Sequence, residues 1–283
     1  MPTEKPFLYL HIGLHKTGST YLQQAVFSQW KGLGYVGRPL RRDTIRAMAE
    51  APERRVLFSS ESLSGSLLDA YRPSDTHWID RQVRQIRRLG ELFPGAGIIM
   101  GFRGHEGWLL SIYKHYLKYG GERSLDRFLE ANDTDGVISL DDLRYMPRIE
   151  AAQSAFPGRI FPFLWEELSE SPEELFADMA RFVGLQPPDW RSSQGKMLNE
   201  GVNQRQADLL LRLNRITGGL SAGKFTQRLR IRSLQAVPGL HRGKAIKLTE
   251  AQANLVRNRL GGDWQELTHR VNALRKSDSD QAR

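Results

Sequence analysis

A glycine loop near the N-terminus contains the first residues whose spacing could do chemistry. It runs from His11 to Tyr21 with the sequence HIGLHKTGSTY, and Gly13 and Gly18 are five positions apart. Glycines at this spacing after a strand are typical of loops that bind phosphate through backbone amides and a helix N-terminus. The nucleoside-triphosphate form of this loop has Lys where this chain has Ser19, and the lysine here is Lys16. The loop therefore predicts a phosphate site that differs from the ATP-binding form.

Two further polar groups follow later apolar runs. Glu61 comes directly after the run from Arg55 to Ser60, and Arg103 directly after the run from Ala96 to Phe102. Neither run ends in the Asp that would hold Mg²⁺ in a nucleoside triphosphatase. Ser111 lies eight residues after Arg103 in a segment with a helical pattern. A guanidinium fork and a hydroxyl are each able to donate hydrogen bonds to phosphate oxygens.

The elements that must position these residues alternate between strand and helix patterns. Short apolar runs predict strands over 7–13, 55–60, 96–102 and 159–164, and Pro162 places the last at a sheet edge or a strand end. Helical patterns cover 76–92, 105–119, 140–155 and 172–183, and a first helix begins at Ser19 or Thr20. This alternation predicts an α/β fold, a P-loop-like, doubly wound parallel sheet flanked by helices. Ligands bind at the carboxyl edge of such sheets, which is where the polar residues above are expected to meet.

The C-terminal part of the chain has helical patterns and a Gly-rich basic stretch in place of the alternating strands and helices. A helical pattern over 204–216 is followed by a Gly-rich basic stretch and then by helical patterns over 249–260 and 263–274. Thr249 is placed to cap the pattern over 249–260. We expect one domain over residues 1–283, with an α/β cofactor-binding core at 7–185. A mostly helical basic region is expected over 186–275, and a frayed tail over 276–283.

Positive charge is concentrated in one segment. Lys and Arg number 41 against 32 Asp and Glu, a net charge of +9. Between Leu209 and Thr249 there is no acidic residue, and nine basic residues account for the whole excess: Arg212, Arg215, Lys224, Arg228, Arg230, Arg232, Arg242, Lys244 and Lys247. Two interpretations stay open, a solvated basic face or a surface that contacts phosphate, sulfate or a polyanion.

Composition excludes several classes of protein. Apolar residues make up 40% and charged residues 26%, which is ordinary for a globular protein. No apolar run approaches the length of a membrane span, and the N-terminus lacks a leader pattern, so a cytoplasmic protein is expected. The absence of Cys excludes disulfides and thiolate chemistry. His105 and Glu106 lack the second His of a zinc helix, and no metal is expected.

The two anion-binding patterns together resemble a known family. Lys16-Thr17-Gly18-Ser19-Thr20-Tyr21 is similar to the 5′-phosphosulfate loop of the sulfotransferases that use 3′-phosphoadenosine 5′-phosphosulfate (PAPS). An Arg at the end of a central strand with a Ser eight residues later resembles the family's second signature, here Arg103 and Ser111, followed by Tyr113 and His115. The stretch from Trp165 to Phe176 resembles the acidic, leucine-containing segment and the proline-started helix that follow a later strand in this family. The resemblance covers residues 7–185 and is nearest to bacterial-type, carbohydrate-sulfotransferase-like members.

This resemblance implies an activity and a set of roles. The enzyme would move the sulfuryl group of PAPS to a hydroxyl or amine of a glycan, a lipid or a small metabolite, releasing 3′-phosphoadenosine 5′-phosphate (PAP). Lys16 would contact the bridging oxygen, Glu61 would be the catalytic base, and His15 or His77 are the alternative bases. The remaining cofactor contacts would come from Thr17, Gly18, Ser19 and Thr20 at the 5′-phosphate and from Arg103 and Ser111 at the 3′-phosphate.

The chain departs from the family near its C-terminus, and other functions remain possible. It lacks the family's Arg-Lys-Gly, and either Ser221–Lys224 or His241–Lys244 could cover the 3′-phosphate. The basic residues from Arg212 to Lys247 could recognise an anionic acceptor. One alternative is a P-loop nucleotide kinase or NTPase; another is a non-enzymatic polyanion-binding protein. No nucleic-acid motif is present, and no nucleic-acid partner is expected.

Overall fold

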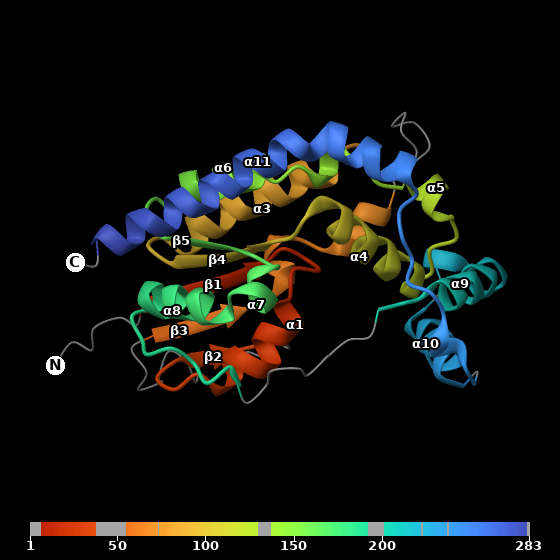
Figure 1. Cartoon of the computed structure of the whole chain (residues 1–283), viewed down its shortest axis with the longest axis horizontal. Helices are drawn as coiled ribbons and strands as arrows, with labels where there is room; N and C mark the ends of the chain where they lie inside the picture. The colour runs from red at the N-terminus through yellow and green to blue at the C-terminus, as the bar shows by residue number, and fades with distance from the viewer. Residues whose placement is uncertain are drawn as a thin grey trace.

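A five-stranded parallel sheet forms the centre of the molecule in this computed structural model (Figure 1). The structure describes residues 7–37, 55–72, 74–129, 137–191, 201–221, 223–236 and 238–281. In the order β2-β3-β1-β4-β5, the strands are Gly34–Val36, Arg55–Ser59, Phe7–Gly13, Gly97–Phe102 and Ile160–Leu164. Every neighbouring pair is parallel. The predicted α/β class is confirmed.

Four strands agree with prediction and one was missed. The predicted strands are present with shifts of at most one residue at their ends. Pro162 lies in β5, an edge strand, as its missing N–H requires. Sequence patterns do not reveal β2, Gly34–Val36, because three residues are too few to show a periodicity.

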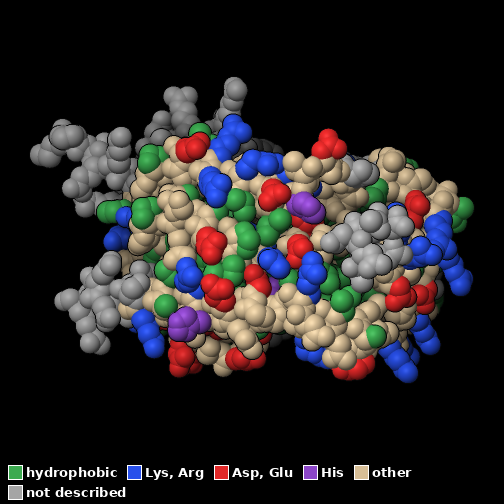
Figure 2. All heavy atoms as spheres, turned by 90° about the horizontal axis from the view of Figure 1, so that it is seen from above, with side chains coloured by type: hydrophobic (Ala, Val, Ile, Leu, Met, Phe, Trp, Pro, Cys, Tyr) green, Lys and Arg blue, Asp and Glu red, His purple; other side chains and the backbone are tan. Residues whose placement is uncertain are grey.

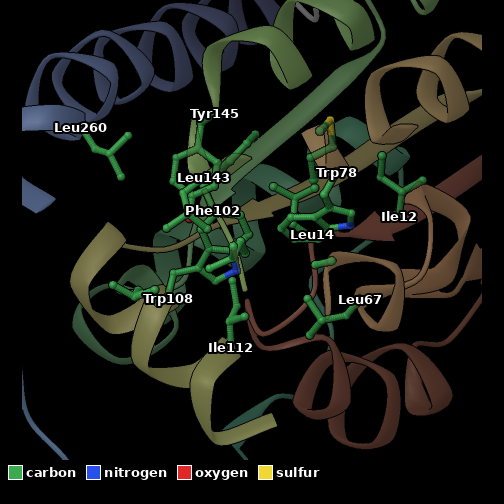
Figure 3. Close-up of a cluster of buried hydrophobic side chains, with 14 of the residues drawn as sticks. Ile12, Leu14, Leu67, Trp78, Phe102, Trp108, Ile112, Leu143, Tyr145 and Leu260 are labelled. Carbon is green, nitrogen blue, oxygen red and sulfur yellow. The ribbon is translucent and has the colours of Figure 1, made fainter. Parts of the chain in front are cut away.

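Helices cover both faces of the sheet, so its central strands are buried on both sides. Side chains of a strand alternate between faces: Leu10 and Ile12 of β1 join one apolar cluster, and Tyr9 joins the other. The first cluster, shown in Figure 3, packs the sheet against α3 (Trp78–Leu92), α4 (His105–Lys118) and α6 (Met146–Ala155). The second packs it against α8 (Pro172–Val183) and the helical segment after β1.

The segment after β1 is helical but not a regular α-helix. It consists of a short α1 (Ser19–Tyr21), a π-helical turn (Leu22–Val26) and a 3₁₀ turn (Phe27–Gln29). Apolar spacing predicts a single helix here and cannot distinguish these windings, since each places Leu22, Val26 and Phe27 in the core.

Shorter elements connect the larger ones. The 3₁₀ turns are Glu61–Ser64, Leu67–Tyr71, Asp141–Leu143, Gly219–Ser221 and Leu240–Arg242. The remaining helices are α5 (Leu125–Phe128), α7 (Glu167–Glu170), α9 (Gln204–Ile216), α10 (Lys224–Ala236) and α11 (Glu250–Gln281). Within the described ranges, none of the helices has the length and apolar character needed to cross a membrane.

A single helix, α11, replaces the two helices expected at the C-terminus and extends to Gln281 within the predicted tail. Thr249 caps α11 as predicted: its hydroxyl accepts from the Gln252 amide at 3.2 Å. The helix then continues through Gly261 and Gly262 to Gln281. Glycine costs about 1 kcal/mol in a helix. The buried side chains before and after the two glycines follow the same helical periodicity, at Val256, Leu260, Leu267 and Val271. One continuous helix therefore buries the apolar faces of both expected helices.

Candidate functional site

The loop after β1 takes a conformation that few sequences tolerate. Lys16 (φ 70°) and Gly18 (φ 93°) both have left-handed backbones. For Lys16 this conformation costs about 1–2 kcal/mol. A Cβ atom on Gly18 would lie 2.7 Å from Leu168 Cδ1 and 3.2 Å from Trp165 Cδ1. Gly18 is therefore required both for its backbone angle and for its close contact with the segment after β5.

The hydroxyl residues of this loop have different surroundings. Thr17 is fully buried and donates to the Leu14 carbonyl at 2.6 Å, so its hydroxyl closes the loop and does not face the cleft. The Ser19 hydroxyl is buried and has no hydrogen-bond partner among the described residues. Gly18 caps α1 without a side-chain hydrogen bond, which leaves the first-turn amides open to an outside acceptor. Ser19 and these amides are suited to bind phosphate oxygens.

A single cleft of about 460 Å³ brings nearly all predicted site residues together. It is formed by the loop after β1, the turn after β3, the end of β4 and one face of α4, which together are the carboxyl edge of the sheet. The predicted residues that line it are Lys16, Gly18, Ser19, Thr20, Glu61, Arg103 and Ser111, and Thr17 is the exception.

The cleft has a strong positive charge. Four cationic residues line it, Lys16, Arg103, Lys114 and Lys118, and Glu61 is its single carboxylate among the described residues. Within the described ranges, no ion pair neutralises any of these four. Burial lowers the pKa of Lys16, and the ammonium groups of Lys118 and Lys114 lower it further, whereas Glu61 opposes the shift. Among the described residues that line the cleft, positive charges therefore outnumber negative ones by three.

Sequence reasoning missed two of these cations. Lys114 and Lys118 follow Ser111 by three and seven positions on α4, so all three lie on one face of the helix. That spacing is visible in the sequence once the helix is assigned. Burial lowers the pKa of both ammonium groups, and Arg103 contributes to the shift at Lys114.

Arg103 is held in place by an aromatic side chain. Its guanidinium carbon lies 3.9 Å from the centre of the Trp165 ring, and the Arg103 carbonyl accepts from the Tyr145 hydroxyl at 2.7 Å. A Cβ on Gly107 would lie 3.1 Å from Arg103 Nε, so glycine there leaves room for the side chain. Burial lowers the pKa of the guanidinium, with Glu166 opposing. Arg103 is thus already positioned over the cleft without a carboxylate partner in the described chain.

Two of the three candidate bases lie side by side. Glu61 begins the 3₁₀ turn directly after β3, and its Oε2 atom is 3.9 Å from His15 Nδ1. His15 Nε2 lies 2.7 Å from the Gly65 carbonyl, which can only accept, so this nitrogen has the hydrogen. A neutral ring with this hydrogen has its lone pair at Nδ1, so Nδ1 can accept a proton that Glu61 has taken up. Both residues line the cleft.

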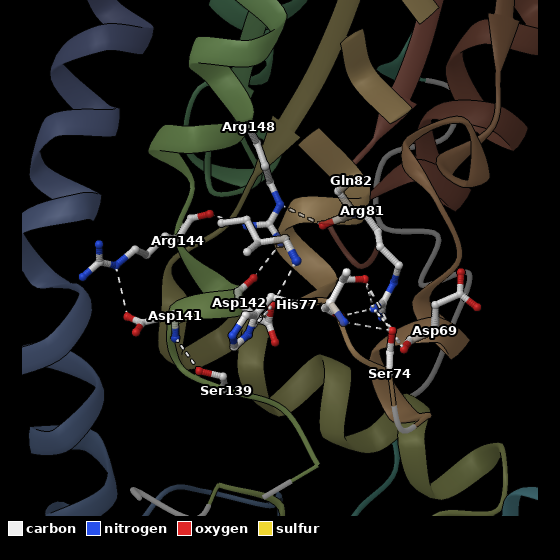
Figure 4. Close-up of polar contacts among 12 residues, drawn as sticks. Asp69, Ser74, His77, Arg81, Gln82, Ser139, Asp141, Asp142, Arg144 and Arg148 are labelled. Atoms are coloured by element: carbon white, nitrogen blue, oxygen red, sulfur yellow. Dashed lines mark hydrogen bonds and ion pairs between the residues drawn. The ribbon is translucent and has the colours of Figure 1, made fainter. Parts of the chain in front are cut away.

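His77 lies elsewhere. It precedes α3, is largely exposed, and its Nδ1 is 3.8 Å from Asp142 Oδ1 (Figure 4). That network is organised by buried Arg148, which donates to Gln82 Oε1 at 2.8 Å and to the Asp142 carbonyl at 2.6 Å. His77 does not line the cleft, so its role as the base is not supported.

A different histidine, His115, does line the cleft. Its Nδ1 is 3.0 Å from the Tyr71 hydroxyl, which donates to the Ile112 carbonyl. Because that hydroxyl has a single hydrogen, His115 Nδ1 must donate to it, leaving Nε2 as an acceptor. Burial lowers the pKa of His115 to about 3, and Lys16, His15 and Lys118 add to the shift. His115 is therefore neutral at physiological pH.

The structure distinguishes between the two basic C-terminal segments. The Gln204 amide donates to the Lys244 carbonyl at 2.9 Å, and Asn203 pairs with Ala245. The neighbouring Val202 lines the cleft, so His241–Lys244 lies beside it. Ser221 instead lines a separate cavity of about 440 Å³. Apart from Lys224, whose side chain is not described, no basic residue of the Leu209–Thr249 segment lines the cleft.

The chain is similar to solved structures of other proteins. The fold and the site define a parallel α/β protein with a cationic cleft at the carboxyl edge of its sheet. No family model and no curated protein matches the chain. Among solved structures, it is similar to a sulfotransferase from Alicyclobacillus acidocaldarius, with 15% identity over 80% of this chain and 100% of the other, at a TM-score of 0.47. It is also similar to mouse sulfotransferase SULT7A1 complexed with PAP, with 10% identity over 97% and 89%, at a TM-score of 0.47.

Proposed function

We propose that the protein is a PAPS-dependent sulfotransferase of the carbohydrate-sulfotransferase-like type. The observation that carries this proposal is that two motifs distant in sequence, Lys16–Tyr21 and Arg103 with Ser111, line one cleft together with Glu61. Each motif resembles the part of that family that binds one phosphate of the cofactor. The proposed acceptor group is a hydroxyl or amine of a glycan, a lipid or a small metabolite.

The unpartnered groups of the cleft fit such a cofactor. PAPS contains a 5′-phosphosulfate and a 3′-phosphate, and the cleft has four cations, one carboxylate and the unpaired Ser19 hydroxyl. Ser19, Thr20 and the first-turn amides would bind the 5′-phosphate, and Arg103 with Ser111 would bind the 3′-phosphate. A charge-assisted hydrogen bond contributes about 1.5–3 kcal/mol, so the site would be selective for a nucleotide with phosphate groups at both the 5′ and the 3′ position.

The chain's own residues would then perform the transfer. When bound, the cofactor supplies an activated sulfuryl group. Lys16 Nζ would donate a hydrogen bond to the oxygen that bridges phosphate and sulfate, where negative charge would develop as the sulfuryl group passes to the acceptor and PAP is released. Glu61 would accept the proton of the attacking hydroxyl or amine. His15 Nδ1, 3.9 Å from Glu61 Oε2, would then share that proton with the carboxyl group.

Thermal unfolding of the full chain with nucleotides tests the proposal. A ligand present at about 100 times its Kd stabilises a protein by about 2.7 kcal/mol. We expect PAP to raise the melting temperature, 5′-AMP to raise it less, and ATP with Mg²⁺ to have little effect. Stabilisation by ATP with Mg²⁺ alone would favour a nucleotide kinase or NTPase. No stabilisation by PAP would refute the proposal.

A further inference from the structure

Most of the basic segment between Leu209 and Thr249 lies in a pair of helices, α9 and α10, outside the cleft. Its helices α9 and α10 lie together at one end of the molecule (Figure 1). Arg230, on the inner face of α10, is buried: its Nε donates to Thr217 Oγ1 at 2.7 Å and its Nη1 to the Gly219 carbonyl at 3.0 Å. These contacts hold Arg230 against the end of α9, and Leu234 on the same helix packs against the core, so the opposite face of α10 points outward.

The outward face of α10 combines apolar and basic side chains. Phe225, Arg228, Leu229 and Arg232 occupy positions i, i+3, i+4 and i+7, and all four are exposed. Phe225 is 74% exposed and Leu229 48%. Ile216, at the end of α9, is 77% exposed. Of the five large hydrophobic side chains that are strongly exposed in the described chain, three are therefore on this helical pair. Such grouping is typical of a contact surface.

The charge of this segment indicates the kind of partner. Between Leu209 and Thr249 there are nine basic residues and no acidic one. Figure 2 shows Lys and Arg side chains protruding at the end of the molecule where α9 and α10 lie. A second copy of this face would be repelled by the same charge. A polyanion such as RNA or an acidic glycan would use the arginines but would leave the aliphatic Leu229 and Ile216 in water.

We propose that the outer face of α10, with Ile216 (the α10 face), docks on an anionic lipid bilayer. Phe225 and Leu229 would enter the interfacial layer, and Arg228 and Arg232 would contact lipid phosphates while their aliphatic stems lie along the apolar boundary. This proposal does not depend on the proposed sulfotransferase activity, because the α10 face lies outside the cleft.

Sedimentation of the full chain with vesicles tests the charged half of the face. The probes are vesicles of phosphatidylcholine alone and of phosphatidylcholine with about one-third phosphatidylserine, an anionic bilayer. We expect binding to the second kind. Arg228→Gln with Arg232→Gln should weaken it about thirty-fold, since each basic residue at an anionic surface contributes about five-fold. The control, Arg87→Gln with Arg88→Gln on α3, removes the same charge from two exposed residues and should leave binding unchanged.

Insertion of the apolar half is tested with a fluorescent label. The chain has no Cys, so Leu229→Cys introduces a unique labelling site. An environment-sensitive fluorophore there should shift to the blue on anionic vesicles. The same label at Leu92→Cys, 58% exposed on α3, should not shift. Absence of vesicle binding, equal weakening by both double-arginine variants, or binding to heparin or RNA but not to vesicles would overturn the proposal. Melting curves of each variant establish that it is folded.

Discussion

Arg103→Met is expected to separate the binding of PAP from that of 5′-AMP. These two nucleotides differ by the 3′-phosphate, which is the group assigned to Arg103 and Ser111. Methionine removes the guanidinium charge and retains an unbranched side chain that packs on Trp165. The variant therefore changes the charge at one end of the cleft and leaves the loop around Lys16 intact.

The magnitude follows from the surroundings of Arg103. A fully exposed ion pair contributes about 0–1 kcal/mol, and a hydrogen bond to a charged group about 1.5–3 kcal/mol. Arg103 is partly buried, has no ion pair in the described chain and is held over Trp165 at 3.9 Å, so little ordering is needed on binding. We expect a loss of about 2 kcal/mol, or about thirty-fold in Kd, for PAP. For 5′-AMP the loss should be within about three-fold, from long-range attraction alone.

Isothermal titration calorimetry of both nucleotides against wild type and variant measures this difference directly. The four dissociation constants form a cycle whose coupling term isolates the contact between Arg103 and the 3′-phosphate. Arg87→Met on α3 is the matched control, since it makes the same chemical change on an exposed surface outside the cleft. Without nucleotide, the free energies of unfolding of wild type and Arg103→Met, taken from melting curves, should agree within about 1 kcal/mol. The lost stacking on Trp165 is offset by the relieved repulsion among the cations of the cleft.

Two outcomes would refute the assignment. If both nucleotides lose affinity equally, Arg103 contributes only general positive charge, and the 3′-phosphate binds elsewhere. If PAP binds the variant as tightly as wild type, the Arg103 and Ser111 pair is not a phosphate site.

Three further predictions concern the base, the loop and the acid stability. Glu61→Gln should reduce turnover with PAPS by about 10²–10⁴-fold, the usual contribution of a general base, with PAP affinity unchanged by calorimetry. Gly18→Ala should destabilise the protein by about 2–4 kcal/mol in urea unfolding, from left-handed strain and the clash with Leu168. His115 has a pKa of about 3 when folded and 6.5 when unfolded. The unfolded state therefore binds more protons between these pH values, and stability falls as pH decreases; His115→Gln should reduce the loss between pH 7 and 5 by about 2 kcal/mol.

Each of these predictions has a control and a contradicting result. Full turnover by Glu61→Gln would move the base assignment to His15. Gly158→Ala shares the positive φ but has no atom within 4 Å of the added Cβ, so it should cost less than Gly18→Ala. Equal costs would mean that the contact with Leu168 is unimportant. A His115→Gln protein that loses stability in acid as steeply as wild type would show that His115 is not the group that titrates.

Local patterns were enough to predict much of the fold. The strands β1, β3, β4 and β5 are short apolar runs bounded by turn residues, and such runs are visible without tertiary information. The helices α8 and α9 begin and end where the sequence predicts. Their alternation with strands implied a parallel sheet, whose carboxyl edge collects the residues that follow each strand.

Other features depended on contacts that no local pattern records. Thr17 and Ser19 are similar residues in one loop, yet the Thr17 hydroxyl donates to the Leu14 carbonyl, whereas the buried Ser19 hydroxyl has no partner among the described residues and only Ser19 lines the cleft. The continuity of α11 across Gly261 and Gly262 depends on partners from distant elements: Asp263, for example, accepts from the Tyr145 amide at 2.7 Å.

The sequence by itself determined which residues follow the strands, and therefore that Lys16, Glu61, Arg103 and Ser111 would share one edge of the sheet. Spacing along the chain is sufficient for this because parallel strands all end on the same side. Only the tertiary structure decided which charges converge. It added Lys114 and Lys118 to the cleft and left the exposed arginines of α9 and α10 outside it. Burial and pairing depend on elements distant in sequence, and for that reason the same kinds of basic residue form a nucleotide site in one place and an outer surface in another.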